Sequence, residues 1–206
     1  MRETIPIPGF AEPVSSLTHF LGALVFAVAS FWLLNRGRGN APRMISLVVF
    51  SFGAVFLLLM SGAYHMLPPE SNMRVMVRRL DHSAIFVLIA ASFTPTHTIL
   101  FRGWGRGGAL FVIWTVAFLG IALKMIYFHD MPRWIGNGLY LAMGWLGFFS
   151  CLSLWRRYGF NFMLPLACGG LAYTAGAILE TLRWPVLIAG VFQWHEVLHV
   201  AVLLGL

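Results

Sequence analysis

The sequence predicts an all-α polytopic membrane bundle of seven transmembrane helices, from two observations. Of the 206 residues, 59% are hydrophobic and only 10% are charged, and the mean hydropathy is +0.81. A soluble domain of this length could not enclose so much apolar surface. The apolar residues fall into runs of about 17 to 25 residues, which suit helices that cross a ~30 Å hydrocarbon layer, and the alternation typical of a membrane barrel is absent.

Seven such runs can be marked along the chain, and short loops rich in glycine, proline or arginine separate them. The loops include "NRGRGNAPR" between the first two runs, "RVMVRR" before the third and "WRRY" after the fifth. No soluble domain fits between the runs, so residues 1–206 are expected to form a single seven-helix domain. The predicted spans are 17–34, 44–66, 82–101, 108–126, 135–155, 163–181 and 187–206.

The charge distribution excludes one class of partner. The net charge of +7 comes from 14 basic residues, nearly all of which flank the spans, where contact with lipid headgroups explains them; Lys124, inside the fourth span, is the main exception. Nucleic-acid binding would require a basic face with exposed aromatic residues between the charges, so membrane lipids and no nucleic acid are expected as partners. Seven basic residues fall on each side of the bundle, so their count does not indicate which side is cytoplasmic, and the sequence indicates no oligomeric state.

Ionisable residues inside a bilayer are costly, and here nearly all of them fall on one side. Odd spans begin, and even spans end, at the same face of the membrane, because consecutive spans alternate in direction. His97, at the far end of the third span, is the exception. The residues at the shared face are His19, His65, Asp81, His82, Glu180, His195 and His199.

The stretch "HEVLH" predicts a metal site. His195 and His199 are four residues apart, so both imidazoles project from one helix face at a spacing at which they can bind one ion, and a catalytic zinc takes three protein ligands plus water. Only "VAVLLGL" follows, so the third ligand must come from another helix. His65 is the best candidate, Ser61 lies one turn before it, and Asp81 begins the next span at the matching depth.

Each of these residues also has a structural interpretation. The three histidines could be buried residues that form hydrogen bonds with backbone or hydroxyl groups. Asp81 could cap the third helix, and Ser61 could line a contact between helices. His19 and Glu180 fit either as partners of the ligands or, slightly better, as interfacial polar residues. A protease is not favoured, because Glu196 is rotated by about 100° from His195 and need not face the metal.

Four ordered stretches make the sequence resemble the haemolysin III proteins, bacterial relatives of the progestin and adipoQ receptors. They are "EPVSSLTHFLGA" (12–23), "SGAYHML" (61–67), "LDHSAIFVLIAASFTP" (80–95) and "HEVLHVAVLL" (195–204). The resemblance implies seven helices with a cytoplasmic N-terminus in the bacterial inner membrane, and a zinc ion held by the matching His65, His195 and His199. It also implies that Asp81 and Ser61 hold or orient the metal-bound water.

The resemblance implies competing functions. Similarity to the receptors, and beyond them to alkaline ceramidases, implies a zinc-dependent hydrolase of amide-linked membrane lipids, or a role in lipid homeostasis. A non-enzymatic receptor with structural zinc and a pore-forming haemolysin are the alternatives. A pore would require a polar stripe through the membrane, whereas the middle and far halves of the spans are almost wholly apolar.

Overall fold

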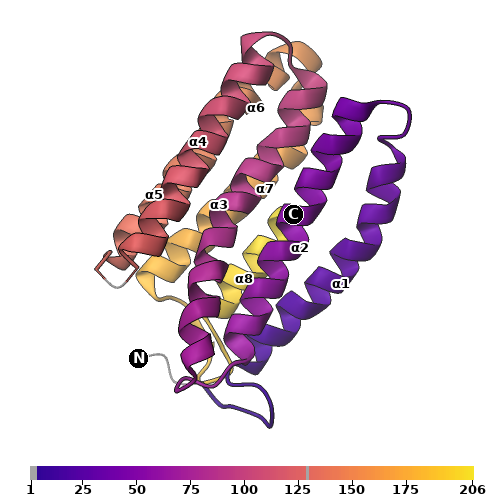
Figure 1. Ribbon diagram of the computed structural model, residues 1–206. Coiled ribbons are helices and arrows are strands. Elements are labelled where there is room, and N and C mark those ends of the chain that lie inside the picture. Colours follow the sequence, from indigo (N-terminus) through magenta and orange to yellow (C-terminus); the bar gives the residue numbers. More distant parts are fainter. Residues whose placement is uncertain (1–3, 129) are drawn as a thin grey trace.

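The computed structural model is an all-α bundle, as the sequence predicts, and describes residues 4–128 and 130–206 (Figure 1). A two-stranded antiparallel hairpin precedes the last helix. The helices are α1 (Pro13–Asn35), α2 (Ala41–Met66), α3 (Asn72–Leu100), α4 (Trp104–Ile126), α5 (Arg133–Trp145), α6 (Gly147–Tyr158), α7 (Phe160–Leu182) and α8 (Trp194–Gly205), and the strands are β1 (Val186–Ile188) and β2 (Phe192–Gln193).

Among the described residues, six segments are long and apolar enough to cross a membrane. The fifth, Trp134–Tyr158, comprises α5 and α6, which meet at Leu146. The backbone of Leu146 stays helical, and its N–H donates to the carbonyl of Met143 three residues back, so the junction is a tightened turn within one span. The chain is therefore an integral membrane protein, and its assignment to one domain stays a prediction.

The predicted seventh span, 187–206, is wrong at its start. Residues 186–193 form the β1–β2 hairpin, and α8 begins only at Trp194. Hydropathy cannot separate these two structures, because the hairpin is as apolar as the helix. Gly190, with φ +76°, supplies the left-handed turn conformation that interrupts the run. The 12 residues of α8 extend about 18 Å, less than the hydrocarbon thickness.

The third helix is longer than its apolar run. It begins at Asn72 rather than at residue 82, and its 29 residues extend about 44 Å. Asp81 consequently lies more than two turns inside α3, so the interpretation of Asp81 as a helix cap is wrong. The first turns of α3, whose sequence includes its arginines, lie at the end of the bundle where α8 begins (Figure 1).

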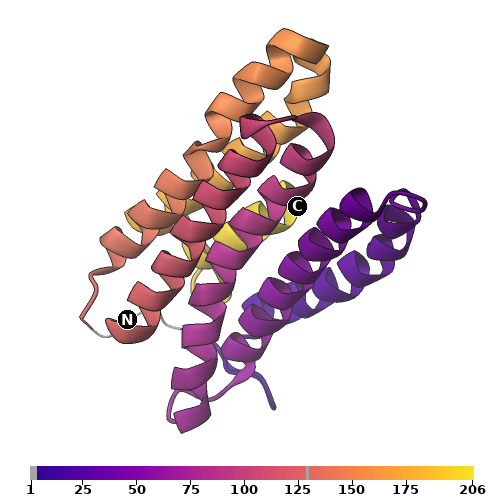
Figure 2. The same ribbon diagram turned by 45° about the horizontal axis from the view of Figure 1, so that its top comes forward.

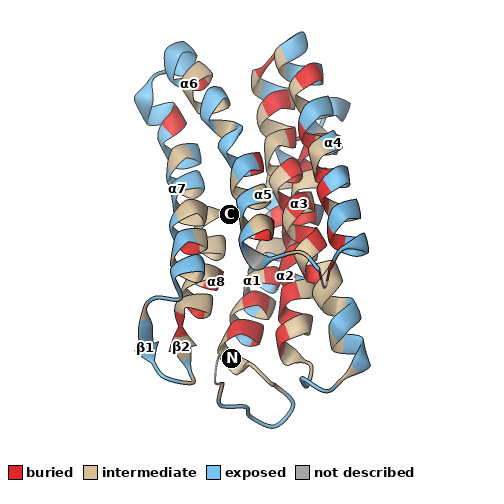
Figure 3. Ribbon diagram, turned by 90° about the vertical axis from the view of Figure 1, so that its left-hand side faces the viewer, coloured by how far each residue is buried: buried red, intermediate tan, exposed pale blue. Residues whose placement is uncertain are grey.

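The short α8 packs between α7 and α1, within the ring of longer helices (Figures 1 and 2). Gly176 of α7 permits this close approach, because a Cβ atom built there would lie 2.7 Å from Cβ of Ala201 in α8. Buried residues concentrate on α2, α3 and the first turns of α8, while α7 and β1 are largely exposed (Figure 3). The start of α8 is therefore enclosed by the ends of the neighbouring helices.

Candidate metal centre

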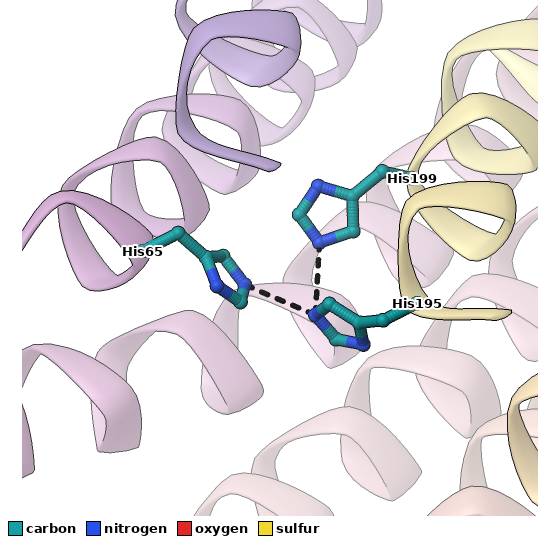
Figure 4. A group of neighbouring side chains, drawn as sticks. All are labelled: His65, His195 and His199. Carbon is teal, nitrogen blue, oxygen red and sulfur yellow. Dashed lines mark hydrogen bonds between the residues drawn. The ribbon is translucent and has the colours of Figure 1, made fainter. Parts of the chain in front are cut away.

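Three histidines from two helices converge at the enclosed end of the bundle (Figure 4). Nε2 of His195 lies 3.2 Å from Nε2 of His65 and 3.2 Å from Nε2 of His199. His65 and His199 are buried, and His195 is partly exposed. The structure thus brings together the three residues that the sequence predicts as metal ligands.

The capping interactions at the start of α8 position the helix that carries His195 and His199. Glu196 and Gln193 form a capping box at the start of the helix, in which the Gln193 N–H donates to Oε2 of Glu196 at 2.9 Å. The other carboxylate oxygen of Glu196 accepts a 2.7 Å hydrogen bond from the Ser15 hydroxyl of α1. The prediction that Glu196 is not a zincin-type base is supported, since both of its oxygens hold α8 in place.

The outer nitrogen of each imidazole faces an acceptor. Nδ1 of His65 lies 2.9 Å from Oε2 of Glu12, Nδ1 of His195 lies 3.1 Å from Oε2 of Glu180, and Nδ1 of His199 lies 3.2 Å from the Ser15 carbonyl. Carboxylates and carbonyls only accept hydrogen bonds, so these contacts place the proton on each Nδ1. Nε2 of His195 then presents a lone pair toward Nε2 of His65 and Nε2 of His199, and the three atoms lie within 4.8 Å of one another.

Three lone pairs converging in a buried site repel one another unless a cation lies between them. Nitrogen ligands placed 2.0–2.1 Å from a zinc-sized ion at the tetrahedral angle are about 3.3 Å apart, close to the observed 3.2 Å. Imidazoles that donate their other N–H to a carboxylate or carbonyl are the usual arrangement around such ions. The geometry and the donor set therefore both fit a metal ion.

Glu12 makes further contacts besides the hydrogen bond that it accepts from the His65 ring. Its other carboxylate oxygen pairs with Arg74 of α3, and its backbone N–H donates to the His65 carbonyl at 3.0 Å. The sequence interpretation gave Glu12 no role at the site. Glu180, for which the interfacial interpretation was slightly preferred, is instead the partner of His195.

The interfacial interpretation of His19 is wrong. His19 is buried in α1, and its ring stacks on that of His199 with centroids 3.8 Å apart. Neither of its ring nitrogens has a hydrogen-bonding partner among the described residues. No spacing rule links "TH" in the first span to "HEVLH" in the last, so only the shared membrane face signals this contact.

Asp81 and Ser61 are both buried on the site's side of the bundle. Asp81 lies within electrostatic range of His19 and His65, and its Oδ2 is 3.3 Å from Nδ1 of His82. Ser61 lies one turn before His65 in α2. Their predicted catalytic roles stay predictions.

His97 is the exception that the sequence predicts. It lies at the opposite end of the bundle, where Nδ1 is 2.6 Å from the Gly105 carbonyl and Nε2 is 2.9 Å from the Ser150 hydroxyl. These two contacts join α3 to α4 and α6, so His97 ties helices together away from the histidine cluster.

The fold and the cluster define a polytopic helical membrane protein with a three-histidine group that can hold a metal ion. The model of the Haemolysin-III related family matches residues 10–206, and the chain belongs to that family. Hemolysin-3 of Bacillus cereus is 30% identical over 187 residues, covering 89% of this chain and 83% of the relative. The Hemolysin-3 homolog of Bacillus subtilis (strain 168) is 30% identical over 170 residues, covering 81% and 78%.

A plant protein extends the similarity beyond bacteria. The Heptahelical transmembrane protein ADIPOR2 of Oryza sativa subsp. japonica is 32% identical over 187 residues, covering 83% of this chain and 80% of the relative. The name of that relative describes seven helices, which agrees with six long segments plus α8 in the described part of this chain. The resemblance to the haemolysin III proteins and their receptor relatives is confirmed.

Proposed function

We propose that this chain is a zinc-dependent, ceramidase-like hydrolase of amide-linked membrane lipids. We further propose that it lies in the bacterial inner membrane with its N-terminus in the cytoplasm. The observation that carries the proposal is the convergence of three imidazoles on one point through their Nε2 atoms. The Nδ1 atoms of the same rings contact two carboxylates and one backbone carbonyl. Zinc is favoured over other ions because imidazole is a preferred ligand and three protein ligands leave one position open.

Zinc held by three neutral imidazoles would supply Lewis-acid chemistry, because it stabilises negative charge on an acyl oxygen and makes bound water more acidic. Glu12, Glu180 and the Ser15 carbonyl would hold the three rings in the tautomer that this requires. Asp81 would accept a proton from the attacking water and pass it to the leaving amine. The Ser61 hydroxyl would donate to the oxyanion.

The position of the cluster suits a lipid substrate. It lies at one end of the spans, where headgroups meet the hydrocarbon layer, and His195 is 22% exposed there. Exposed apolar side chains of α7 and the hairpin, among them Leu182 and Leu187, offer contact surface for acyl chains. A substrate can therefore approach sideways from the leaflet.

A receptor or signalling protein with a structural metal is the second candidate. The ligands and their partners come from α1, α2, α7 and α8, so an ion at the cluster would also hold the first two helices to the last two. A pore is less favoured, since apolar clusters fill the space between α2, α3, α4 and α5.

Two measurements on purified protein test the proposal. Elemental analysis should find about one zinc per chain, strongly reduced in His199→Ala and unchanged in His97→Ala, whose histidine lies at the other end of the bundle. Fatty-acid release from mixed amide and ester lipids, followed by mass spectrometry, should stop with a chelator and fall at least about 100-fold in Asp81→Asn.

The two results separate the candidates. Full zinc content without release from any lipid rejects hydrolysis and leaves the structural metal, whereas equal release by Asp81→Asn and the parent rejects Asp81 as the proton acceptor. Unchanged zinc in His199→Ala rejects the metal assignment itself.

A further inference from the structure

Three basic side chains gather on the side of α3 that faces α4 and α5. Arg78 and Arg79 of α3 place their guanidinium carbons 5.2 and 5.5 Å from the ring centroid of Phe128. Lys124, near the end of α4, is only 6% exposed, and Arg78 lies within electrostatic range of it. We call Arg78, Arg79 and Lys124 the basic cluster.

The basic cluster lacks acidic partners among the described residues. The carboxylates that form ion pairs there, Glu12, Asp81 and Glu180, pair instead with Arg74 and with histidines. The Nε atoms of Arg78 and Arg79 are buried, and no described residue forms a hydrogen bond with them. Aromatic contacts offset only part of the cost of burying such groups, at about 0.5–2 kcal/mol each.

The ammonium group of Lys124 lies where a side chain at position 136 of α5 would otherwise be. A Cβ atom built at Gly136 would lie 2.5 Å from Nζ of Lys124, so any larger residue there would exclude the ammonium group. Gly136 is in the first turns of α5, where the helix dipole is positive and disfavours a cation. Lys124 beside this helix N-terminus and the two arginines over the Phe128 ring therefore form a site for an anion.

We propose that the basic cluster binds the phosphate group of an anionic membrane lipid. Guanidinium groups match phosphate oxygens in a forked geometry, and a lysine adds a third donor with full charge. The neighbouring outer face of α4 is apolar, with Leu123 40% and Ile126 69% exposed, and gives acyl chains a surface to follow. A free phosphate ion would gain nothing from that surface.

The lipid site adjoins the histidine cluster without sharing a ligand with it. The ring of His82 lies 5.6 Å from that of Phe128, and its Nδ1 is 3.3 Å from Asp81. The Tyr140 hydroxyl donates to the His82 carbonyl at 3.0 Å, and Lys124 lies 5.9 Å from the Tyr140 ring. The inference goes beyond the proposed hydrolase, since lipid binding here requires neither metal nor turnover.

Native mass spectrometry of the full chain in an uncharged detergent tests the site with two lipids that differ only in phosphate. Dioleoyl phosphatidic acid should bind at least about tenfold more tightly than dioleoylglycerol. Lys124→Met and the double variant Arg78→Gln/Arg79→Gln should each remove about tenfold of that preference. Lys124→Met should keep the fold, because methionine is an unbranched side chain of similar size and removes only the charge.

Arg157→Gln is the matched control, since Arg157 also lies over a phenylalanine ring, 5.3 Å from that of Phe101, but at the opposite end of the bundle. It should keep the preference, and so should His199→Ala. Equal binding of the two lipids overturns the proposal, as does an unchanged preference in both basic-cluster variants. Displacement of the lipid by an equal concentration of inorganic phosphate assigns the site to a soluble anion and overturns the lipid assignment.

Discussion

The Glu180 carboxylate should tune metal affinity without being a ligand. It accepts from Nδ1 of His195 at 3.1 Å and thereby fixes the tautomer that presents Nε2 to the cluster. In Glu180→Ala this partner is lost, and the imidazole is free to rotate or to move its proton. In Glu180→Gln a neutral amide oxygen can still accept, with roughly half the strength of a charge-assisted bond.

The exposure of the pair sets the size of the effect. Loss of such a partner lowers metal affinity about 10- to 100-fold. Because the His195 and Glu180 side chains are 22% and 25% exposed, water can replace part of the lost bond, and we expect the lower end. Glu180→Ala should therefore weaken zinc about tenfold, or about 1.4 kcal/mol, and Glu180→Gln about threefold.

Competition between the protein and a chromophoric chelator measures these dissociation constants directly. Glu70→Gln serves as the control, because Glu70 is an exposed carboxylate in the loop between α2 and α3 at the same end of the bundle. Zinc affinity in Glu180→Ala equal to the parent would show that the carboxylate does not orient His195. A loss as complete as in His199→Ala would make Glu180 itself a ligand.

Two further predictions concern the bundle. With both native cysteines replaced, membrane-impermeant labelling should reach Arg38→Cys and Glu70→Cys from opposite sides of a vesicle, since α2 lies between them; labelling from one side contradicts the topology. His97→Phe should lower the free energy of unfolding in detergent by about 1–2 kcal/mol through loss of two hydrogen bonds, while zinc content stays unchanged; equal stability would show that these bonds contribute nothing.

The alternation of spans across the membrane made the clustering of the three histidines predictable from the sequence. His65 is 130 residues from His195, yet the alternation of spans places both at one membrane face, and few polar residues compete for the role. The separation of four residues places His195 and His199 on one helix face in the structure, because α8 starts just before them.

The predictions that failed concern helix boundaries and contacts between helices, which a hydropathy pattern does not contain. The hairpin before α8 has the composition of a membrane helix, and only Gly190 marks its turn. Asp81 was placed at a helix start because α3 continues through a charged segment that reads as a loop. Glu12 and His19 belong to the site through packing of α1 against α2 and α8, which one sequence does not encode as a spacing.

Under the proposed function, the 130-residue separation within the histidine cluster would make metal loading a late event in biogenesis. At about 5–20 residues per second, a ribosome needs roughly 7–26 s to synthesise the intervening chain after His65 emerges. During that interval Glu12 can already hold the His65 ring, because Glu12 precedes α1 directly and His65 lies in the last turn of α2. The ion would thus report that every helix has been inserted, and a chain stalled in the translocon would stay unloaded.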